Sequence, residues 1–270
     1  MPHVRETRSI AGAAALVLAA ASMAACDVAV NTLHGGRAQA EQSWTRTYTL
    51  AGADTSVDIV NVSGTITVEA VDGNTLDVKA HISVRGSTEE EAQAALKQVE
   101  IGEEASAGRV RLEAKYPREL RRRGVEVTYT IRAPRSAKVS LQTVNGQISV
   151  GGLLAGVKAE TTNGSVVGRG LANTVAAMTT NGEIKIQMAS LGGDGISLET
   201  TNGTIDLKLP GDAKGTVSAR CVNGGISVSD LPFEKVGEGS RRKLDGTING
   251  GGSAVKLETV NGSIRVGKTS

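Results

Sequence analysis

The chain contains an internal repeat built around the dipeptide Asn-Gly. Six copies recur with spacings of 18, 18, 21, 21 and 38 residues, and their asparagines are Asn145, Asn163, Asn181, Asn202, Asn223 and Asn261. A unit of about 20 residues is too small to bury an apolar face by itself, so units of this length stack on one another. The repeat therefore restricts the fold to an array of similar supersecondary units.

Apolar and polar residues alternate on both sides of each asparagine. The positions six and four residues before it are apolar in every copy, and the third position after it is Ile or Val. The position two before it is Thr, except for Cys221 in one copy. Such alternation is typical of strands with one buried face, so each copy is expected to hold two strands joined at a turn with positive φ.

The buried positions shift parity across this turn, which either a hairpin in an antiparallel meander or a tight solenoid corner explains. The near identity of successive copies favours the solenoid, in which like residues stack in columns and the asparagines form a ladder. We therefore predict an all-β fold, a β-solenoid (β-helix) of 18–21-residue coils over residues 136–270.

An earlier copy of the repeat precedes this array within residues 43–135. Ser63-Gly64 replaces Asn-Gly there, Asn61 replaces the Thr, and the buried positions hold Val57, Ile59, Ile66 and Val68. The sequence Ser-Thr-Glu-Glu at 87–90 is a capping-box pattern, which predicts a helix over about 88–99. This section is expected to cap the N-terminal end of the stack. The last strand, 263–267, is expected to be an open edge that can pair with a second copy.

The N-terminus is expected to be an export signal. Arg5 and Arg8 precede an apolar run that ends at Cys26 and is too short to span a membrane. Its end, Met23-Ala24-Ala25-Cys26, resembles the lipobox of bacterial lipoproteins. The resemblance implies that residues 1–25 are removed and that Cys26 carries a lipid anchor. An ordinary secretory signal cleaved near 38–40 is the alternative. Residues 26–42 are expected to form a flexible tether.

Composition limits the chemistry available to the chain. One Trp, three Tyr and one Phe leave almost nothing for bases to stack on, and the net charge is only +2, so no nucleic-acid partner is expected. His3, His34 and His81 are scattered, so neither a metal site nor another cofactor is predicted. With Cys26 lipidated, Cys221 is the one thiol left. A buried small residue is expected there, and a reactive thiol or an intermolecular disulfide is the alternative.

No catalytic residue is predicted. The outward positions mix Lys, Glu, Ser, Gln and Arg without the column of carboxylates that a polysaccharide-cleaving enzyme would need. The six asparagines are expected to hold the turns rather than to bind a ligand. The single Gly-Gly-Asp-Gly segment at 192–195 is similar to calcium-binding repeats, but one copy predicts a loop.

Two basic clusters stand outside the repeat pattern. One consists of Arg118, Arg121, Arg122 and Arg123, and the other lies at 241–243. In a lipid-anchored protein these arginines, Arg121, Arg122 and Arg123 above all, can contact anionic headgroups or acidic polysaccharide. A solvated loop is the alternative.

The blocks Thr-Thr-Asn-Gly and Thr-Val-Asn-Gly, each followed by an alternating strand, and the run Thr-Ile-Asn-Gly-Gly-Gly at 247–252 resemble the bacterial DUF4097 family, which carries the label "putative adhesin". The resemblance covers roughly residues 50–268. It implies a β-solenoid on exported or membrane-tethered proteins, and it brings no catalytic residues with it.

These observations together predict a non-enzymatic cell-envelope lipoprotein that presents its solenoid as an adhesin-like binding or scaffolding surface. The expected partners are a membrane, through the lipid on Cys26, and glycans or other envelope proteins. The expected location is the periplasmic face or the cell surface. A carbohydrate-active β-helix enzyme acting on envelope or extracellular polysaccharide is the first alternative, and an accessory module in envelope-stress signalling is the second.

Overall fold

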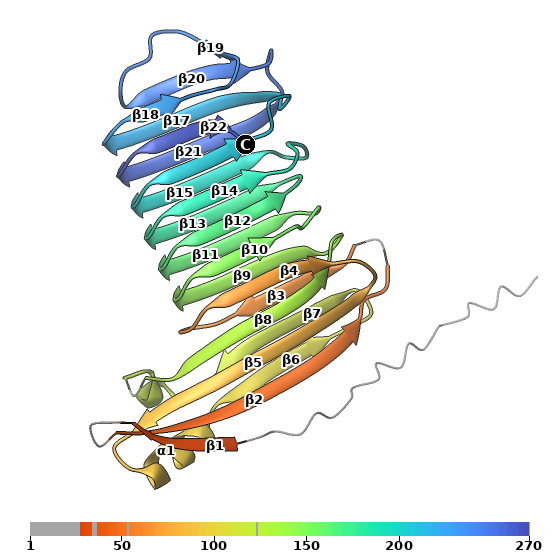
Figure 1. Cartoon of the computed structure of the whole chain (residues 1–270), viewed down its shortest axis with the longest axis vertical. Helices are drawn as coiled ribbons and strands as arrows, with labels where there is room; N and C mark the ends of the chain where they lie inside the picture. Colours follow the sequence, from red (N-terminus) through yellow and green to blue (C-terminus); the bar gives the residue numbers. More distant parts are fainter. Residues whose placement is uncertain (1–27, 34–36, 53, 123, 270) are drawn as a thin grey trace, which may run out of the picture.

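The computed structural model describes residues 28–33, 37–52, 54–122 and 124–269. They form two 11-stranded sheets that face each other along a rod (Figure 1). In spatial order, sheet I contains β1 (Val28–Leu33), β2 (Arg37–Thr49), β5 (Thr75–Gly86), β8 (Glu126–Pro134), β4 (Ile66–Val71), β10 (Ile148–Gly151), β12 (Val166–Leu171), β14 (Ile184–Met188), β16 (Ile205–Leu209), β22 (Ile264–Lys268) and β18 (Ile226–Val228).

Sheet II begins at the same end of the rod. In spatial order it contains β6 (Glu100–Ala105), β7 (Arg109–Lys115), β3 (Ser56–Val60), β9 (Lys138–Asn145), β11 (Val157–Asn163), β13 (Val175–Asn181), β15 (Ile196–Asn202), β21 (Ser253–Asn261), β17 (Gly215–Asn223), β20 (Lys243–Ile248) and β19 (Phe233–Lys235).

Each copy of the repeat is one coil, with a strand in sheet II followed by a strand in sheet I. Neighbouring coils pair in parallel and in register, so that Asn163 faces Asn145 on one side and Asn181 on the other. The predicted solenoid is thus confirmed, and the antiparallel meander is excluded for these strands. The core consists of stacked columns of buried Val, Ile, Leu and Ala from both sheets, because only alternate side chains point inward from a strand.

The glycine of each Asn-Gly pair is required by the close approach of neighbouring coils. A Cβ atom on Gly182 would lie 2.0 Å from the carbonyl oxygen of Gly164, and one on Gly203 would lie 1.8 Å from that of Gly182. None of the six repeat asparagines is among the described non-glycine residues with positive φ. The expectation of a positive-φ turn is therefore wrong for the asparagines, because the chain makes a solenoid corner there and not a hairpin.

The coils do not stack in the order of the sequence. Along the rod they follow as β7–β8, β3–β4, β9–β10, β11–β12, β13–β14, β15–β16, β21–β22 and β17–β18. The C-terminal coil thus lies between two earlier ones, and β22 pairs with β16 on one side and β18 on the other. The expected open edge at the C-terminal strand is wrong, because the chain runs out through β19 and β20 and then returns into the stack.

Antiparallel strands close the stack where the parallel coils end. At the N-terminal end, β5, β2 and β1 extend sheet I and β6 extends sheet II, all in antiparallel pairing. At the other end, β20 and β19 extend sheet II in the same manner. The earlier copy with the corner Ser63-Gly64 forms β3–β4 and belongs to the same two sheets, so the described residues contain no break near residue 136.

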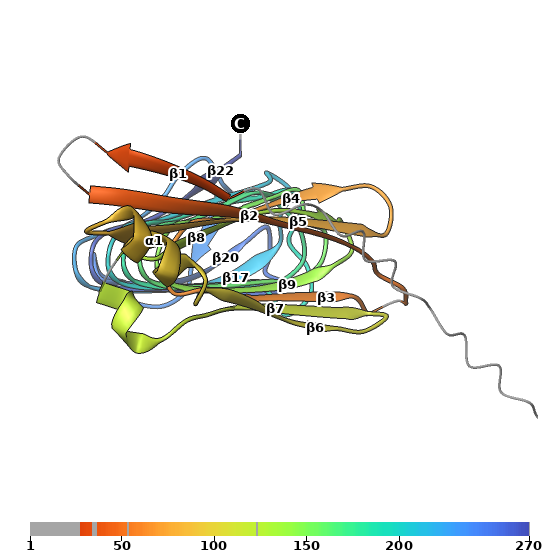
Figure 2. The same ribbon diagram turned by 90° about the horizontal axis from the view of Figure 1, so that it is seen from below.

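The helix of the N-terminal section, α1 (Glu89–Leu96), covers β5 and β2 at that end of the rod (Figure 2). Thr88 is its N-cap, one residue after the Ser87 that the Ser-Thr-Glu-Glu pattern indicates, and the Thr88 hydroxyl accepts a hydrogen bond from the Glu91 amide at 3.2 Å. The helix ends at Leu96 rather than near 99. Among the described residues, no helix is both long enough and apolar enough to cross a membrane.

Residues 26–42 differ from the expected flexible tether. β1 pairs with β2, and β2 pairs with β5 from Ala38 onward. The tether expectation is wrong for 28–33 and 37–42, because these residues satisfy their backbone groups in the capping sheet. The signal-peptide residues 1–25 lie outside the described residues.

Candidate binding surfaces

The six asparagines form a ladder along one corner of the rod. From Asn163 onward, each amide nitrogen donates to the amide oxygen of the asparagine in the preceding coil, at 2.8–2.9 Å, which makes five bonds. The ladder follows the spatial order, so Asn261 stands between Asn202 and Asn223. All six side chains are exposed. The amides satisfy one another along the rod, which accounts for the asparagines without a ligand.

A buried column of hydroxyls lies directly inside this corner. Thr161, Thr179, Thr200 and Thr259 each donate to the carbonyl oxygen of the corner glycine one coil earlier, at 2.9–3.0 Å. In the early copy, Asn61 takes this place and donates to the Val127 carbonyl at 2.7 Å. These bonds satisfy buried carbonyl oxygens that sheet pairing leaves free at the corner.

In the last coil, Cys221 occupies the position that Thr holds in the other copies, so a thiol ends the column of buried hydroxyls. Its side chain is buried, and Sγ lies 3.8 Å from the Arg241 carbonyl oxygen. Burial raises the pKa of the Cys221 thiol, and the nearby Arg242 opposes this only in part. A thiol of this kind is protonated and slow to react at neutral pH, which agrees with a buried small residue.

The outer face of sheet II is balanced in charge within single strands. Lys158 pairs with Glu160 at 2.8 Å, and Lys256 pairs with Glu258 at 3.1 Å. Val144, Met178, Val222 and Val260 are the exposed large apolar residues on this face. Such scattered apolar side chains are ordinary on a protein surface and define no patch.

The outer face of sheet I is different, because it carries one cation on each of four adjacent strands. The four residues, named here the basic strip, are Arg169 on β12, Lys185 on β14, Lys208 on β16 and Arg265 on β22. Lys185 pairs with Glu183. A hollow of 190 Å³ is lined by three of the four cations together with Gln187 and Asp206.

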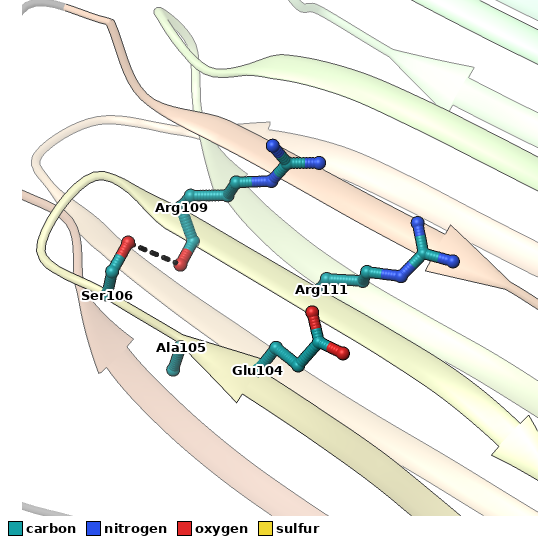
Figure 3. A pocket seen from close by; sticks show the side chains of 5 residues that line it. All are labelled: Glu104, Ala105, Ser106, Arg109 and Arg111. Atoms are coloured by element: carbon teal, nitrogen blue, oxygen red, sulfur yellow. Dashed lines mark hydrogen bonds between the residues drawn. The ribbon is translucent and has the colours of Figure 1, made fainter.

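A larger hollow of 480 Å³ lies at the hairpin between β6 and β7 (Figure 3). Glu104 and Arg111 both line this hollow, and Ser106 Oγ donates to the Arg109 carbonyl at 3.4 Å. The Arg109 guanidinium pairs with Asp58 at 2.6 Å. Because Asp58 neutralises the charge of Arg109, this hollow offers less positive charge to a ligand than the basic strip does.

The arginine cluster predicted from the sequence lies mostly beyond what the structure describes. Arg118–Arg122 form a 3-10 helix between β7 and β8, the side chains of Arg121 and Arg122 are outside the description, and Arg123 is outside it altogether. Cys26 is outside it as well. The segment 192–195 is a loop between β14 and β15, and among the described residues no three His, Cys, Asp or Glu side chains are grouped to hold a metal ion.

Two parallel sheets wound into one rod and closed by antiparallel strands define a capped β-solenoid. The family model of the Toastrack domain, DUF4097, matches residues 128–267, which is more than half of the chain. The chain belongs to this family, and the resemblance of its repeated blocks to DUF4097 is confirmed.

One solved structure shows the same fold, and a second is similar at a lower score. A "putative cell adhesion protein" from Clostridium sporogenes is similar over 85% of this chain and 100% of that chain, with a TM-score of 0.50 and 14% identity. A "putative adhesin" from Bacteroides fragilis covers 83% of this chain and 96% of its own, with a TM-score of 0.39 and 12% identity. No curated protein matches the sequence. At these identities the likeness to the first structure shows the fold alone.

Proposed function

We propose that the chain is a non-enzymatic binding protein of the cell envelope, whose solenoid faces dock extended partners. The observation that carries the proposal is the in-register stacking of the coils. Equivalent outward positions recur at one strand spacing, about 4.8 Å, along a straight face. An extended partner can contact several successive coils at once, so weak single contacts add up.

Two further observations support a binding role over an enzymatic one. The sheet II carboxylates Glu160 and Glu258 each pair with a lysine on the same strand, an arrangement that suits a stable surface rather than acid–base catalysis. The name of the Clostridium structure, a cell adhesion protein, agrees with a binding role.

The binding role is tested with the purified mature chain and isolated cell envelopes. We expect saturable binding to envelopes or to their extracted glycans, with no change in the size of the polysaccharide on long incubation. Turnover that is abolished by changing a single acidic residue would overturn the proposal in favour of the carbohydrate-active enzyme.

The proposed anchor is a lipid on Cys26, and the support for it is the lipobox-like sequence before this residue. The intact mass of the chain extracted from membranes is the direct test, with Cys26→Ala as the control. A diacylglycerol-sized addition that is lost in the variant is the expected result. An unmodified chain that begins further downstream would instead mean a freely secreted or periplasmic protein.

A further inference from the structure

The basic strip is a zigzag of cations on the outer face of sheet I. Lys208 stands in register with Gln187 on one neighbouring strand and with Gly267 on the other. In the adjacent column, Asp206 separates Lys185 from Arg265. The strip therefore presents one positive charge per coil over four coils, alternating between two columns.

Most of this charge is unpaired. Within the described part of the chain, Arg169, Lys208 and Arg265 have no carboxylate at ion-pair distance, whereas Lys185 pairs with Glu183. Asp206 is the one carboxylate inside the strip. Four cations that lie on adjacent strands of one face repel one another unless a counter-charge is present. The face is therefore complementary to a negatively charged partner.

Gly267 has no side chain, and this leaves room for Lys208 to lie across the neighbouring strand. A Cβ atom on Gly267 would lie 2.8 Å from Lys208 Nζ, so the lysine lies across the neighbouring strand in the space that this glycine leaves. The lysine thereby reaches the adjacent coil. The hollow beside it is lined by Lys208 itself together with Arg169, Lys185 and Gln187.

We propose that the basic strip binds a linear acidic polysaccharide that runs along the rod. A sugar unit in such a polymer is about as long as one strand spacing, about 4.8 Å, so a chain laid along the rod meets one cation per unit. Acid groups on alternate sides of an extended polymer match cations that alternate between two columns. This inference rests on the proposed binding function and names the ligand class for it.

Other polyanions fit the strip less well. Insertion of a protein surface into a membrane usually combines cations with apolar anchors, and the exposed large apolar residues of the described chain lie outside the strip. Single-stranded nucleic acid is held by stacking on aromatic rings, and the strip contains none.

The fourth cation of the strip is in place because of the unusual stacking order. Arg265 follows Asp206 on the face because β22 is inserted beside β16. If the coils stacked in sequence order, β18 would occupy this place and would contribute Ser227, which lies beside Arg265 in the actual structure. The insertion thus extends the run of cations from three coils to four.

The test measures binding of polygalacturonate, which carries one carboxylate per sugar, to the purified mature chain by calorimetry at several salt concentrations. The strip variant is Arg169→Gln/Lys185→Gln/Lys208→Gln/Arg265→Gln. The matched control, Lys138→Gln/Lys158→Gln/Arg220→Gln/Lys256→Gln, removes the same charge from the outer face of sheet II. All eight positions point outward, and circular dichroism checks that both variants are folded.

We expect the strip variant to bind at least about a hundredfold more weakly and the control to bind nearly as the wild type, since each cation near a polyanion contributes about a fivefold factor. Binding should weaken steeply with salt, and the methyl-esterified polymer should not bind. Equal losses in the two variants, or no loss in the strip variant, would overturn the proposal.

Three further outcomes separate this proposal from the proposed function. Strip-dependent binding to anionic vesicles with no binding to the polymer would identify a membrane surface and overturn the polysaccharide. Wild-type binding to envelopes that survives in the strip variant would overturn the strip as the site and leave the proposed binding function standing. A wild type that binds neither envelopes nor polymer would overturn both.

Discussion

Asn261 donates a hydrogen bond from Nδ2 to Oδ1 of Asn202 at 2.8 Å, although the two residues are 59 positions apart in the chain. Asn223, the next repeat asparagine after Asn202, donates instead to Asn261 at 2.8 Å. These two bonds show that the last coil, β21–β22, is inserted between β15–β16 and β17–β18. In sequence order, Asn223 would have donated to Asn202.

Disulfide trapping tests this order directly. Glu199 of β15 stands in register with Glu258 of β21, and both side chains point outward. Parallel neighbours about 4.8 Å apart are within reach of a disulfide, whereas residues two strands apart are not. In a chain with Cys26→Ser and Cys221→Thr, the pair Glu199→Cys/Glu258→Cys should therefore cross-link on mild oxidation. The control pair Glu199→Cys/Arg220→Cys should not, and the reverse result would mean that the coils follow the sequence.

Each asparagine of the ladder should stabilise the fold in proportion to the number of ladder hydrogen bonds that it makes. Asn181 donates to Asn163 and accepts from Asn202, whereas Asn223 makes one ladder bond only. We expect Asn181→Ala to lower the free energy of unfolding by about 1 kcal/mol and Asn223→Ala by about half as much. Denaturant unfolding measures both. Thr180→Ala, at an exposed neighbouring position, is the control and should change little.

The corner glycines should tolerate no side chain at all. A Cβ atom on Gly182 would lie 2.0 Å from the Gly164 carbonyl oxygen, and both groups belong to rigid backbone. Gly182→Ala is therefore expected to lower the free energy of unfolding by about 3 kcal/mol. Gly156→Ala is the matched control, since a Cβ atom there meets nothing within 4 Å. Similar melting temperatures for the two variants would contradict the close stacking of the corners.

The sequence was sufficient to predict the coil, because the signals for it are local. The inward columns follow from alternation, and a helix that starts near Thr88 follows from the capping pattern. The position of the early corner at Ser63-Gly64 was also predictable, since Val57 and Ile66 occupy the same offsets as their counterparts in the later copies.

The stacking order was not predictable, because the coils are interchangeable. Val255 packs on Ile196 and on Val217 with the same kind of contact, so the column pattern does not specify neighbours. The sequence did contain one signal for the return of the chain into the stack. Asn249, Gly250 and Gly251 all have positive φ, between 49° and 89°, and they turn the chain back toward the stack. The place of Arg265 in the basic strip depends on this order, so the full strip was missed for the same reason.

Tyr129 should destabilise the fold through its hydroxyl. The ring is completely buried, and its hydroxyl has no hydrogen-bond partner among the described residues. An unpaired buried hydroxyl costs about 1 kcal/mol, so Tyr129→Phe is expected to raise the free energy of unfolding by about that amount at neutral pH. The partly exposed Tyr116→Phe is the control, and a loss of stability in Tyr129→Phe would contradict the unpaired hydroxyl.

The same side chain should make stability depend on alkaline pH. Burial, and to a smaller extent the nearby Tyr116, raise the pKa of Tyr129 far above its usual value. Above about pH 10 an unfolded tyrosine releases its proton, whereas the folded Tyr129 retains it. The free energy of unfolding therefore falls as the pH rises beyond that point, and it should fall less steeply in Tyr129→Phe. Parallel slopes for the two chains between pH 9 and 11, about the ordinary tyrosine pKa, would contradict the shift.

Among the six repeat asparagines, Asn223 should be the one that deamidates first. The reaction needs the backbone nitrogen of the following glycine to attack the side-chain carbonyl carbon, which releases ammonia and forms a succinimide that water then opens to Asp or isoaspartate. In the other five pairs this nitrogen donates to the asparagine carbonyl of the next coil, as Gly182 does to Asn202 at 3.0 Å. Gly224 belongs to the terminal coil, and its amide has no such acceptor among the described residues.

Peptide mapping after storage at mildly alkaline pH measures this selectivity. We expect conversion at Asn223 well before conversion at Asn163 or Asn181, because a bonded amide must break its hydrogen bond before it can attack. The denatured chain is the control, and there all six pairs should react at similar rates. The new carboxylate at position 223 no longer donates to Asn261, so the converted chain should also lose stability in its last coil. Conversion at Asn181 first in the folded chain would mean that the corner amides do not protect the ladder.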